Sequence, residues 1–171
     1  MKFPSNRALP LLIVSSAFLL AVTSCKKSSN NGGASGSMSA TVGSTAWANN
    51  YATVGLYASS FGIGLFDIIG LQFKNGDSSE FTLEFPTPIT VNLPVNADTA
   101  ALIITYSDSK SGETYTGMTG GFGNVVLTVT SYDSTHHTIG GTFNGSMVSV
   151  TNFPDSILVT NGKFSTNYTV N

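Results

Sequence analysis

From Met38 to the C-terminus, apolar and polar residues alternate with the period of a β-strand. In the segment 81–85 the sequence FTLEF places three apolar side chains on one face, and a threonine and a glutamate on the other. Residues 102–106 and 125–129 alternate in the same way. Residues 63–73 are apolar on both faces, as in a strand at the centre of a sheet. Apolar residues do not follow the spacing of an amphipathic helix anywhere in this region, so the pattern predicts strands throughout.

Turn signals separate these segments. Asn-Gly pairs at 75–76 and 161–162 predict tight hairpins, because both residue types tolerate a positive φ. Further turns are expected at 109–112, 132–136 and 152–155.

Two details of the pattern predict irregular strands. The apolar residues of 139–143 and the pair Val148 and Val150 have opposite parity, which predicts a bulge or bend near 145–147. Prolines on both sides of residues 89–93 place that segment at a sheet edge. Together the signals predict an all-β domain, an antiparallel β-sandwich of about ten short strands, with a partly closed β-barrel as the alternative.

The N-terminal segment has a different character. Residues 1–7 are short and basic, residues 8–22 are apolar, and small residues precede Cys25. The apolar stretch is short for a membrane-spanning helix, which needs roughly 20 apolar residues. This is the layout of a cleaved signal peptide, predicted to cover residues 1–24. The sequence KKSSNNGGASGS then predicts a flexible tether over 25–37, followed by one domain at 38–171.

Val22-Thr23-Ser24-Cys25 resembles the lipobox that lipoprotein signal peptidase reads in bacteria. The resemblance implies that Cys25 carries the lipid anchor and becomes the first residue of the mature chain. Stable attachment to a membrane takes more than one acyl chain, and mature lipoproteins of this kind carry three. An aspartate does not follow Cys25, so the inner-membrane retention signal is missing and an outer-membrane location in the cell envelope is expected. Lys26 and Lys27 leave open which side of that membrane the domain faces.

The net charge of the mature chain limits the kinds of molecule that it can bind. After Cys25 is exposed by cleavage, five lysines stand against nine acidic residues, a net charge of −4, and from Met38 onward the net charge is −6. Three scattered lysines cannot form a basic patch, which excludes nucleic acid as a partner. With its only cysteine lipidated, the monomer has no disulfide and depends on its core.

Metal and catalytic signals are weak in this sequence. His136 and His137 are adjacent, so on a strand they would face opposite sides, and a solvated turn is the expected setting. The oxygen-rich loop 108–113 lacks the spacing of a calcium motif. Glu80 and Glu84 share a strand face but lie roughly 13 Å apart along it, too far for a pair of glycosidase carboxylates. Asp67 is expected to be a partly buried, hydrogen-bonded core group.

The other candidate motifs also have structural explanations. Residues 117–123 are glycine-rich but precede a strand, which excludes a phosphate cradle at a helix N-terminus. Trp47 is expected in the core, although an exposed aromatic platform for sugars is the alternative. We therefore predict no catalytic residues, no metal site and no cofactor.

Three short motifs resemble the O-glycan acceptor pattern of Bacteroidota. They are Asp98-Thr99-Ala100, Asp133-Ser134-Thr135 and Asp155-Ser156-Ile157, all in predicted turns. The resemblance implies Thr99, Ser134 and Ser156 as acceptors.

Four ordered motifs carry a wider resemblance: GSTAWA at 43–48, LTVTSYD at 127–133, GGTF at 140–143 and VTNGKF at 159–164. In this order the chain resembles a family of uncharacterised Bacteroidota lipoproteins over about residues 38–170. That resemblance implies a β-rich fold and carries over no catalytic residue. The expected function is a membrane-anchored, non-enzymatic module that binds a glycan or an envelope protein. A structural accessory of the envelope is the alternative, and a hydrolase ranks third.

Overall fold

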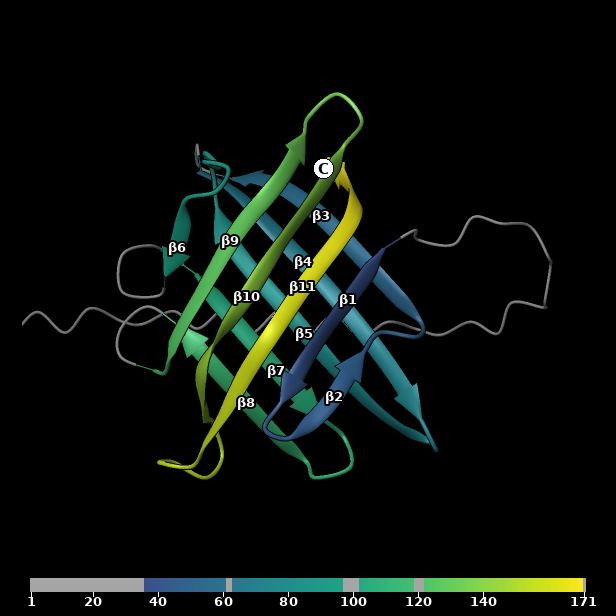
Figure 1. Cartoon of the computed structure of the whole chain (residues 1–171), viewed down its shortest axis with the longest axis vertical. Helices are drawn as coiled ribbons and strands as arrows, with labels where there is room; N and C mark the ends of the chain where they lie inside the picture. The colour runs from purple at the N-terminus through teal and green to yellow at the C-terminus, as the bar shows by residue number, and fades with distance from the viewer. Residues whose placement is uncertain (1–35, 61–62, 97–101, 119–121, 171) are drawn as a thin grey trace, which may run out of the picture. The chain divides into compact units, whose positions relative to one another are not determined.

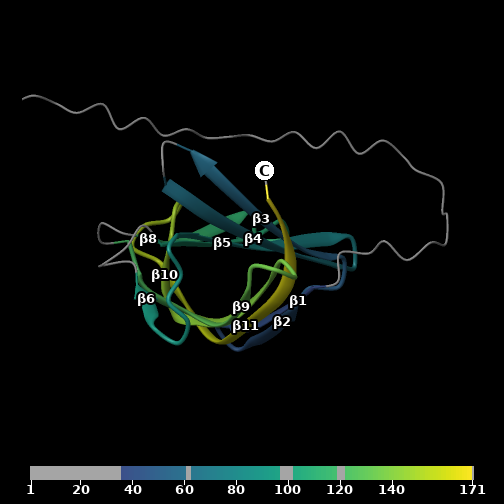
Figure 2. The ribbon, with the colours of Figure 1, turned by 90° about the horizontal axis from the view of Figure 1, so that it is seen from above.

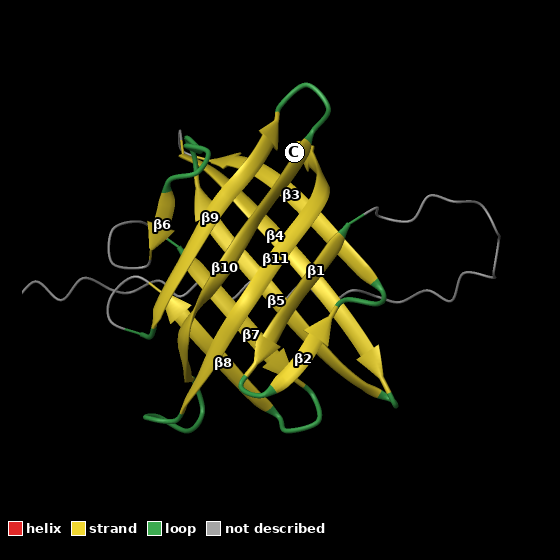
Figure 3. Cartoon of the chain, in the orientation of Figure 1, coloured by secondary structure: helices red, strands yellow, loops and turns green. Residues whose placement is uncertain are grey.

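The computed structural model describes residues 36–60, 63–96, 102–118 and 122–170, and this part of the chain is all-β (Figures 1 and 3). It contains strands and no helix, as the alternation predicts. Eleven strands lie in the described part: β1 (Ser37–Val42), β2 (Thr45–Ala48), β3 (Ala52–Ser60), β4 (Ile63–Lys74), β5 (Asp77–Pro86), β6 (Pro94–Asn96), β7 (Ile103–Asp108), β8 (Glu113–Met118), β9 (Asn124–Asp133), β10 (Thr138–Ser149) and β11 (Ser156–Val170). The predicted signal peptide, Cys25 and most of the predicted tether lie outside the described residues.

The strands form one hydrogen-bonded sheet in the order β2-β1-β11-β3-β4-β5-β7-β8-β10-β9-β6, with a further pairing between β10 and β11. This sheet folds into two facing layers, whose strands cross in Figure 1. Seen from above in Figure 2, β3, β4, β5 and β8 lie in one fairly flat layer, and β1, β2, β9, β10 and β11 curve around the other. Two short pairings join the layers, antiparallel between β8 and β10 and parallel between β3 and β11.

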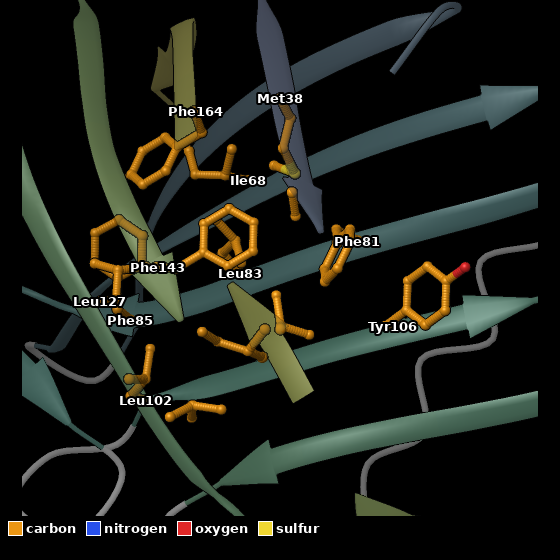
Figure 4. Packing of buried hydrophobic residues seen from close by; sticks show 14 of the residues in the cluster. Met38, Ile68, Phe81, Leu83, Phe85, Leu102, Tyr106, Leu127, Phe143 and Phe164 are labelled. Carbon is orange, nitrogen blue, oxygen red and sulfur yellow. The ribbon is translucent and has the colours of Figure 1, made fainter. Parts of the chain in front are cut away.

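The core lies between the layers, and its residues are the ones that alternation predicts. Phe81, Leu83 and Phe85 are buried, whereas their neighbours in β5 are partly exposed. The same holds for β7, which supplies Ile104 to the core, and for β9, which supplies Leu127. Figure 4 shows these side chains meeting between the layers. The segment predicted as a central strand is β4, which pairs with β3 on one side and β5 on the other.

One predicted hairpin is wrong. Asn75-Gly76 does turn the chain between β4 and β5, with φ values of 56° and 91°. Asn161-Gly162, in contrast, lies inside β11, which continues to Val170. Between the pairs Phe143↔Gly162 and Gly145↔Val159, β11 advances one residue more than β10. Asn161, at φ 54°, therefore belongs to a β-bulge instead of a turn.

The bulge predicted near residues 145–147 is found close by, but not on the strand that the parity argument implied. A register shift does fall at Phe143/Gly145, close to the expected place, but the extra residue belongs to β11. β10 keeps its parity, so Met147 is fully buried and Val150 is 61 % exposed. The predicted edge segment 89–93 is a loop. The edge strand begins just after it, as the short β6, which pairs with β9.

Candidate functional site

A groove with a volume of about 500 Å³ lies where the β1–β2, β4–β5 and β7–β8 hairpins meet at one end of the layers (Figure 1). Its described lining comes from these six strands, their turns and one residue of β11. The volume is within the range of about 300–1,000 Å³ that is usual for small-molecule sites.

Aromatic side chains form the inner wall of the groove. Trp47, Tyr106 and Tyr115 all line it. The core ring of Phe81 contacts Trp47 edge to face at 4.8 Å and packs against Tyr106, also at 4.8 Å. Figure 4 shows Tyr106 at the margin of the core with its hydroxyl directed away from the other rings. The predicted core position of Trp47 is confirmed, because its side chain is 4 % exposed.

The phenol of Tyr106 is held in its protonated form. Burial, and then the nearby Asp108 carboxylate, raises its pKa above the usual 10.0. The Tyr106 hydroxyl therefore remains a hydrogen-bond donor at neutral pH.

A chain of hydrogen bonds fixes the polar wall. The indole Nε1 of Trp47 donates to Ser79 Oγ over 2.7 Å, and Ser79 Oγ donates to Gln72 Oε1 over 3.5 Å. Gln72 Nε2 donates in turn to the carbonyl oxygen of Ala48 over 2.7 Å. These bonds tie β2 to β4 and β5, so the wall is already ordered before a ligand arrives.

Charges of both signs surround the groove. Lys74, Lys110, Asp77 and Asp108 line it. The only ion pair within the described residues lies elsewhere, between His136 and Asp133, so neither lysine is paired with a carboxylate in that part of the chain. The two ammonium groups can therefore donate hydrogen bonds to a ligand.

The histidine pair lies in the β9–β10 turn, solvated as predicted. His136 Nδ1 is 2.7 Å from Asp133 Oδ2, and both side chains are exposed. This hydrogen bond, with those from the backbone N–H groups of His136 and Thr135, lowers the pKa of Asp133 to about 2. His137 has a φ of 52° and packs against the ring of Tyr168. The two imidazoles have separate partners.

The two carboxylates of the oxygen-rich loop 108–113 accept hydrogen bonds from other groups of the protein. Asp108 accepts hydrogen bonds from the backbone N–H of Lys110 and the hydroxyl of Ser111, which closes the β7–β8 turn. Glu113 accepts hydrogen bonds from Ser149, Thr151 and Asn152, and these lower its pKa. In the part of the chain that the structure describes, no group of three or more His, Cys, Asp or Glu is placed to hold a metal ion.

The surroundings of Asp67 agree only in part with the prediction of a partly buried, hydrogen-bonded core group. Asp67 is partly buried, as expected, but its Oδ1 has no hydrogen-bond partner among the residues that the structure describes. Its register partner in β5 is Glu84. Its strand neighbours Phe66 and Ile68 are the residues that face the core, so Asp67 points out of the layer. Burial, followed by repulsion from Glu84 and Glu80, raises its pKa to about 6.

Two of the three predicted O-glycan acceptors are accessible. Ser134 is exposed in the β9–β10 turn, and Ser156 is exposed at the start of β11. Thr99 lies outside the described residues, as does the predicted lipidation site Cys25.

Sequence reasoning did not find the groove. The sequence predicts a core position for Trp47, which is correct, but strand alternation does not show that a buried ring also borders a surface hollow. The only available signal was the presence of polar residues around Trp47 and in the turns at 75–78 and 108–111.

No protein-family model matches this chain, and no curated protein or solved structure matches it either. Among the described residues, no helix has the length and hydropathy needed to span a membrane.

Proposed function

We propose that this chain is a lipid-anchored, non-enzymatic protein of the cell envelope that binds a neutral glycan in the groove between β2, β5 and β7. The observation that carries this proposal is the composition of the groove: the partly exposed ring of Tyr115 beside the edges of Trp47 and Tyr106, several hydroxyls, and two lysines that pair with no carboxylate among the described residues. We interpret the two layers that hold the groove as a β-sandwich.

This composition suits a sugar better than other small ligands. A sugar ring has an apolar C–H face, which packs on aromatic rings, and hydroxyls at its edge, which exchange hydrogen bonds with polar side chains. In the groove, Tyr115 supplies most of the aromatic surface that a sugar can reach, since Trp47 and Tyr106 are almost wholly buried, and the hydroxyls and lysines supply the polar contacts. The net charge of −6 from Met38 onward disfavours a polyanionic glycan and again excludes nucleic acid.

The anchored location is supported by the sequence alone. Residues 1–24 have the layout of a lipoprotein signal, Cys25 follows it, and residues 25–37 are rich in Ser, Gly and Asn. Such a tether would let the groove reach glycans a short distance from an outer membrane. The family resemblance to Bacteroidota lipoproteins points to the same location.

The second candidate function is a structural one, in which the chain binds a protein partner. Phe153, Val150 and Leu158 are each more than half exposed, on the β10–β11 loop or the strands that flank it. A hydrolase ranks below both. Asp67 and Glu84 are opposite each other in the sheet, but neither lines the described hollows.

The proposal is tested by titrating the mature chain with neutral linear oligosaccharides built from glucose, xylose, mannose or N-acetylglucosamine. We expect at least one series to bind, and Lys74→Ala with Lys110→Ala to weaken that binding about tenfold, since each 1.4 kcal/mol is a factor of ten. Lys163→Ala is the matched control, because Lys163 is exposed on β11 and does not line the groove. Equal loss in the control, or no binding to any series, would contradict the proposal.

A further inference from the structure

A pair of exposed aromatic rings lies beside the groove. Tyr51 precedes β3 and Phe73 is near the end of β4; their ring centroids are 5.2 Å apart at an interplanar angle of 77°. Tyr51 is 72 % exposed and Phe73 is 49 % exposed. Rings as exposed as these contribute little to the core, and their faces are available to a ligand.

The Asn50 side chain holds this pair in place. Its Nδ2 donates to the carbonyl oxygen of Phe73 over 2.6 Å, and its Oδ1 accepts from the Phe73 N–H over 2.7 Å. The backbone N–H groups of Asn50 and Tyr51 both donate to the carbonyl oxygen of Leu71. Four hydrogen bonds therefore fix the Asn50-Tyr51 segment against β4, and the aromatic pair is ordered without a ligand.

A second hollow, of about 320 Å³, is lined by Phe73, and Tyr51 packs on Phe73 outside that lining. Phe73 and Leu71 supply its apolar side, and the hydroxyls of Ser107, Ser109 and Thr114 supply its polar side, together with the Glu80 carboxylate. Aromatic and aliphatic surface beside hydroxyls and a carboxylate can contact both the C–H face and the hydroxyls of a sugar.

The two hollows share a rim. Ser78, Ser79 and Asp108 line both the groove and the second hollow. The hollows lie on opposite faces of the layer, because Gln72 alternates with Leu71 and Phe73 along β4. A ligand that leaves the groove therefore reaches Phe73 by bending around the end of the layer, over the residues that both hollows share. The described lining of the second hollow includes Glu80, Asp108 and Glu113 but no lysine, so it disfavours an anionic residue at this position.

We propose that the Tyr51–Phe73 pair and the second hollow form an additional subsite for the same ligand, which is therefore an extended neutral glycan chain and not a single sugar or a chain end. This proposal rests on the proposed function. The groove holds one part of the chain, and the aromatic pair stacks on a sugar residue further along it.

Chain length separates this subsite from the groove. We titrate the mature chain with disaccharides to hexasaccharides of the neutral series named above. Affinity should rise with chain length, and Tyr51→Ala or Phe73→Ala should weaken hexasaccharide binding about tenfold while leaving disaccharide binding unchanged. Phe153→Ala is the matched control, because Phe153 is also 72 % exposed but belongs to the β10–β11 loop, whereas Tyr51 packs on Phe73, which lines the second hollow.

Each outcome decides a different point. If both variants bind the hexasaccharide as tightly as the unmodified chain does, the additional subsite is refuted and groove binding stands. If no oligosaccharide binds at any length, the subsite and the proposed function both fail. A variant that does not fold is replaced by Tyr51→Leu or Phe73→Leu, which keep apolar bulk but remove the aromatic face. In the unmodified complex, upfield NMR shifts of sugar ring protons should report the stacking directly, and their absence would overturn it.

Discussion

At the scale of single residues, two aspartates show how surroundings determine proton affinity. Asp133 accepts three hydrogen bonds in an exposed turn, and its pKa falls to about 2. Asp67 lies among aliphatic neighbours of β4, with Oδ1 unpaired and Glu84 opposite, and its pKa rises to about 6. The charged form of Asp67 is therefore unfavourable in the folded chain.

The raised pKa of Asp67 predicts that the stability of the folded chain depends on pH. The folded chain binds the Asp67 proton more tightly than the unfolded chain, because the pKa rises from 3.8 to about 6. The contribution of Asp67 to the free energy of unfolding is therefore greatest below about pH 4, falls as the pH rises to about 6, and then stays constant. Asp67→Asn should raise the free energy of unfolding at neutral pH by on the order of 1 kcal/mol, after allowance for solvent screening. The new amide can also donate to Glu84.

Urea denaturation across this pH range measures the effect. Asp155→Asn, at an exposed acid of the β10–β11 loop, is the control and should change the profile little. If Asp67→Asn left the neutral-pH stability unchanged or lower, the account of this carboxyl would be wrong.

At the scale of strands, alternation along the sequence predicted which residues are buried in β5, β7 and β9, because one face of each strand packs on the core. It could not predict how Asn-Gly pairs would be used. Asn75-Gly76 is followed by a strand that returns beside β4, whereas Asn161-Gly162 lies where β11 pairs with both β1 and β10. Since both uses need the same positive φ at asparagine, the dipeptide alone does not distinguish a hairpin from a bulge.

The two glycines should respond differently to the same substitution. A Cβ at Gly162 would lie 2.2 Å from the carbonyl oxygen of Phe143 and 2.7 Å from its ring, whereas a Cβ at Gly76 meets nothing within 4 Å. Gly162→Ala should therefore lower the free energy of unfolding by about 3 kcal/mol through overpacking. Gly76→Ala, with φ 91°, should lower it by about 1 kcal/mol through backbone strain. Urea denaturation of both variants tests this, and an equal or reversed order would contradict the bulge.

At the scale of the whole molecule, the groove was beyond prediction because it depends on tertiary structure. Trp47 and Tyr115 both line it although 68 positions separate them in the sequence. Neither residue belongs to a ligand-binding motif, and only the meeting of three hairpins brings them together. A lipid-anchored location, in contrast, is a prediction from the sequence alone, and it depends on one residue, Cys25.

The anchor is tested by expressing the full chain in a Gram-negative bacterium. We expect intact mass spectrometry to show a mature protein that begins at Cys25 and carries acyl chains, and the protein to enter the detergent phase on phase separation. Cys25→Ser should keep residues 1–24 and remain in the aqueous phase. An unacylated protein that begins at Met1 would contradict the anchor. The same mass measurement on protein from the native organism would detect glycans at Thr99, Ser134 or Ser156.

We propose that the hairpin end of the sheet binds a glycan, and NMR chemical-shift mapping with a neutral hexasaccharide locates the bound ligand residue by residue. The largest backbone shifts are expected around Tyr106, Lys110 and Tyr115, and should extend to Tyr51 and Phe73. Shifts centred on the β9–β10 turn at the other end, around His136, or no shifts with any series, would contradict it.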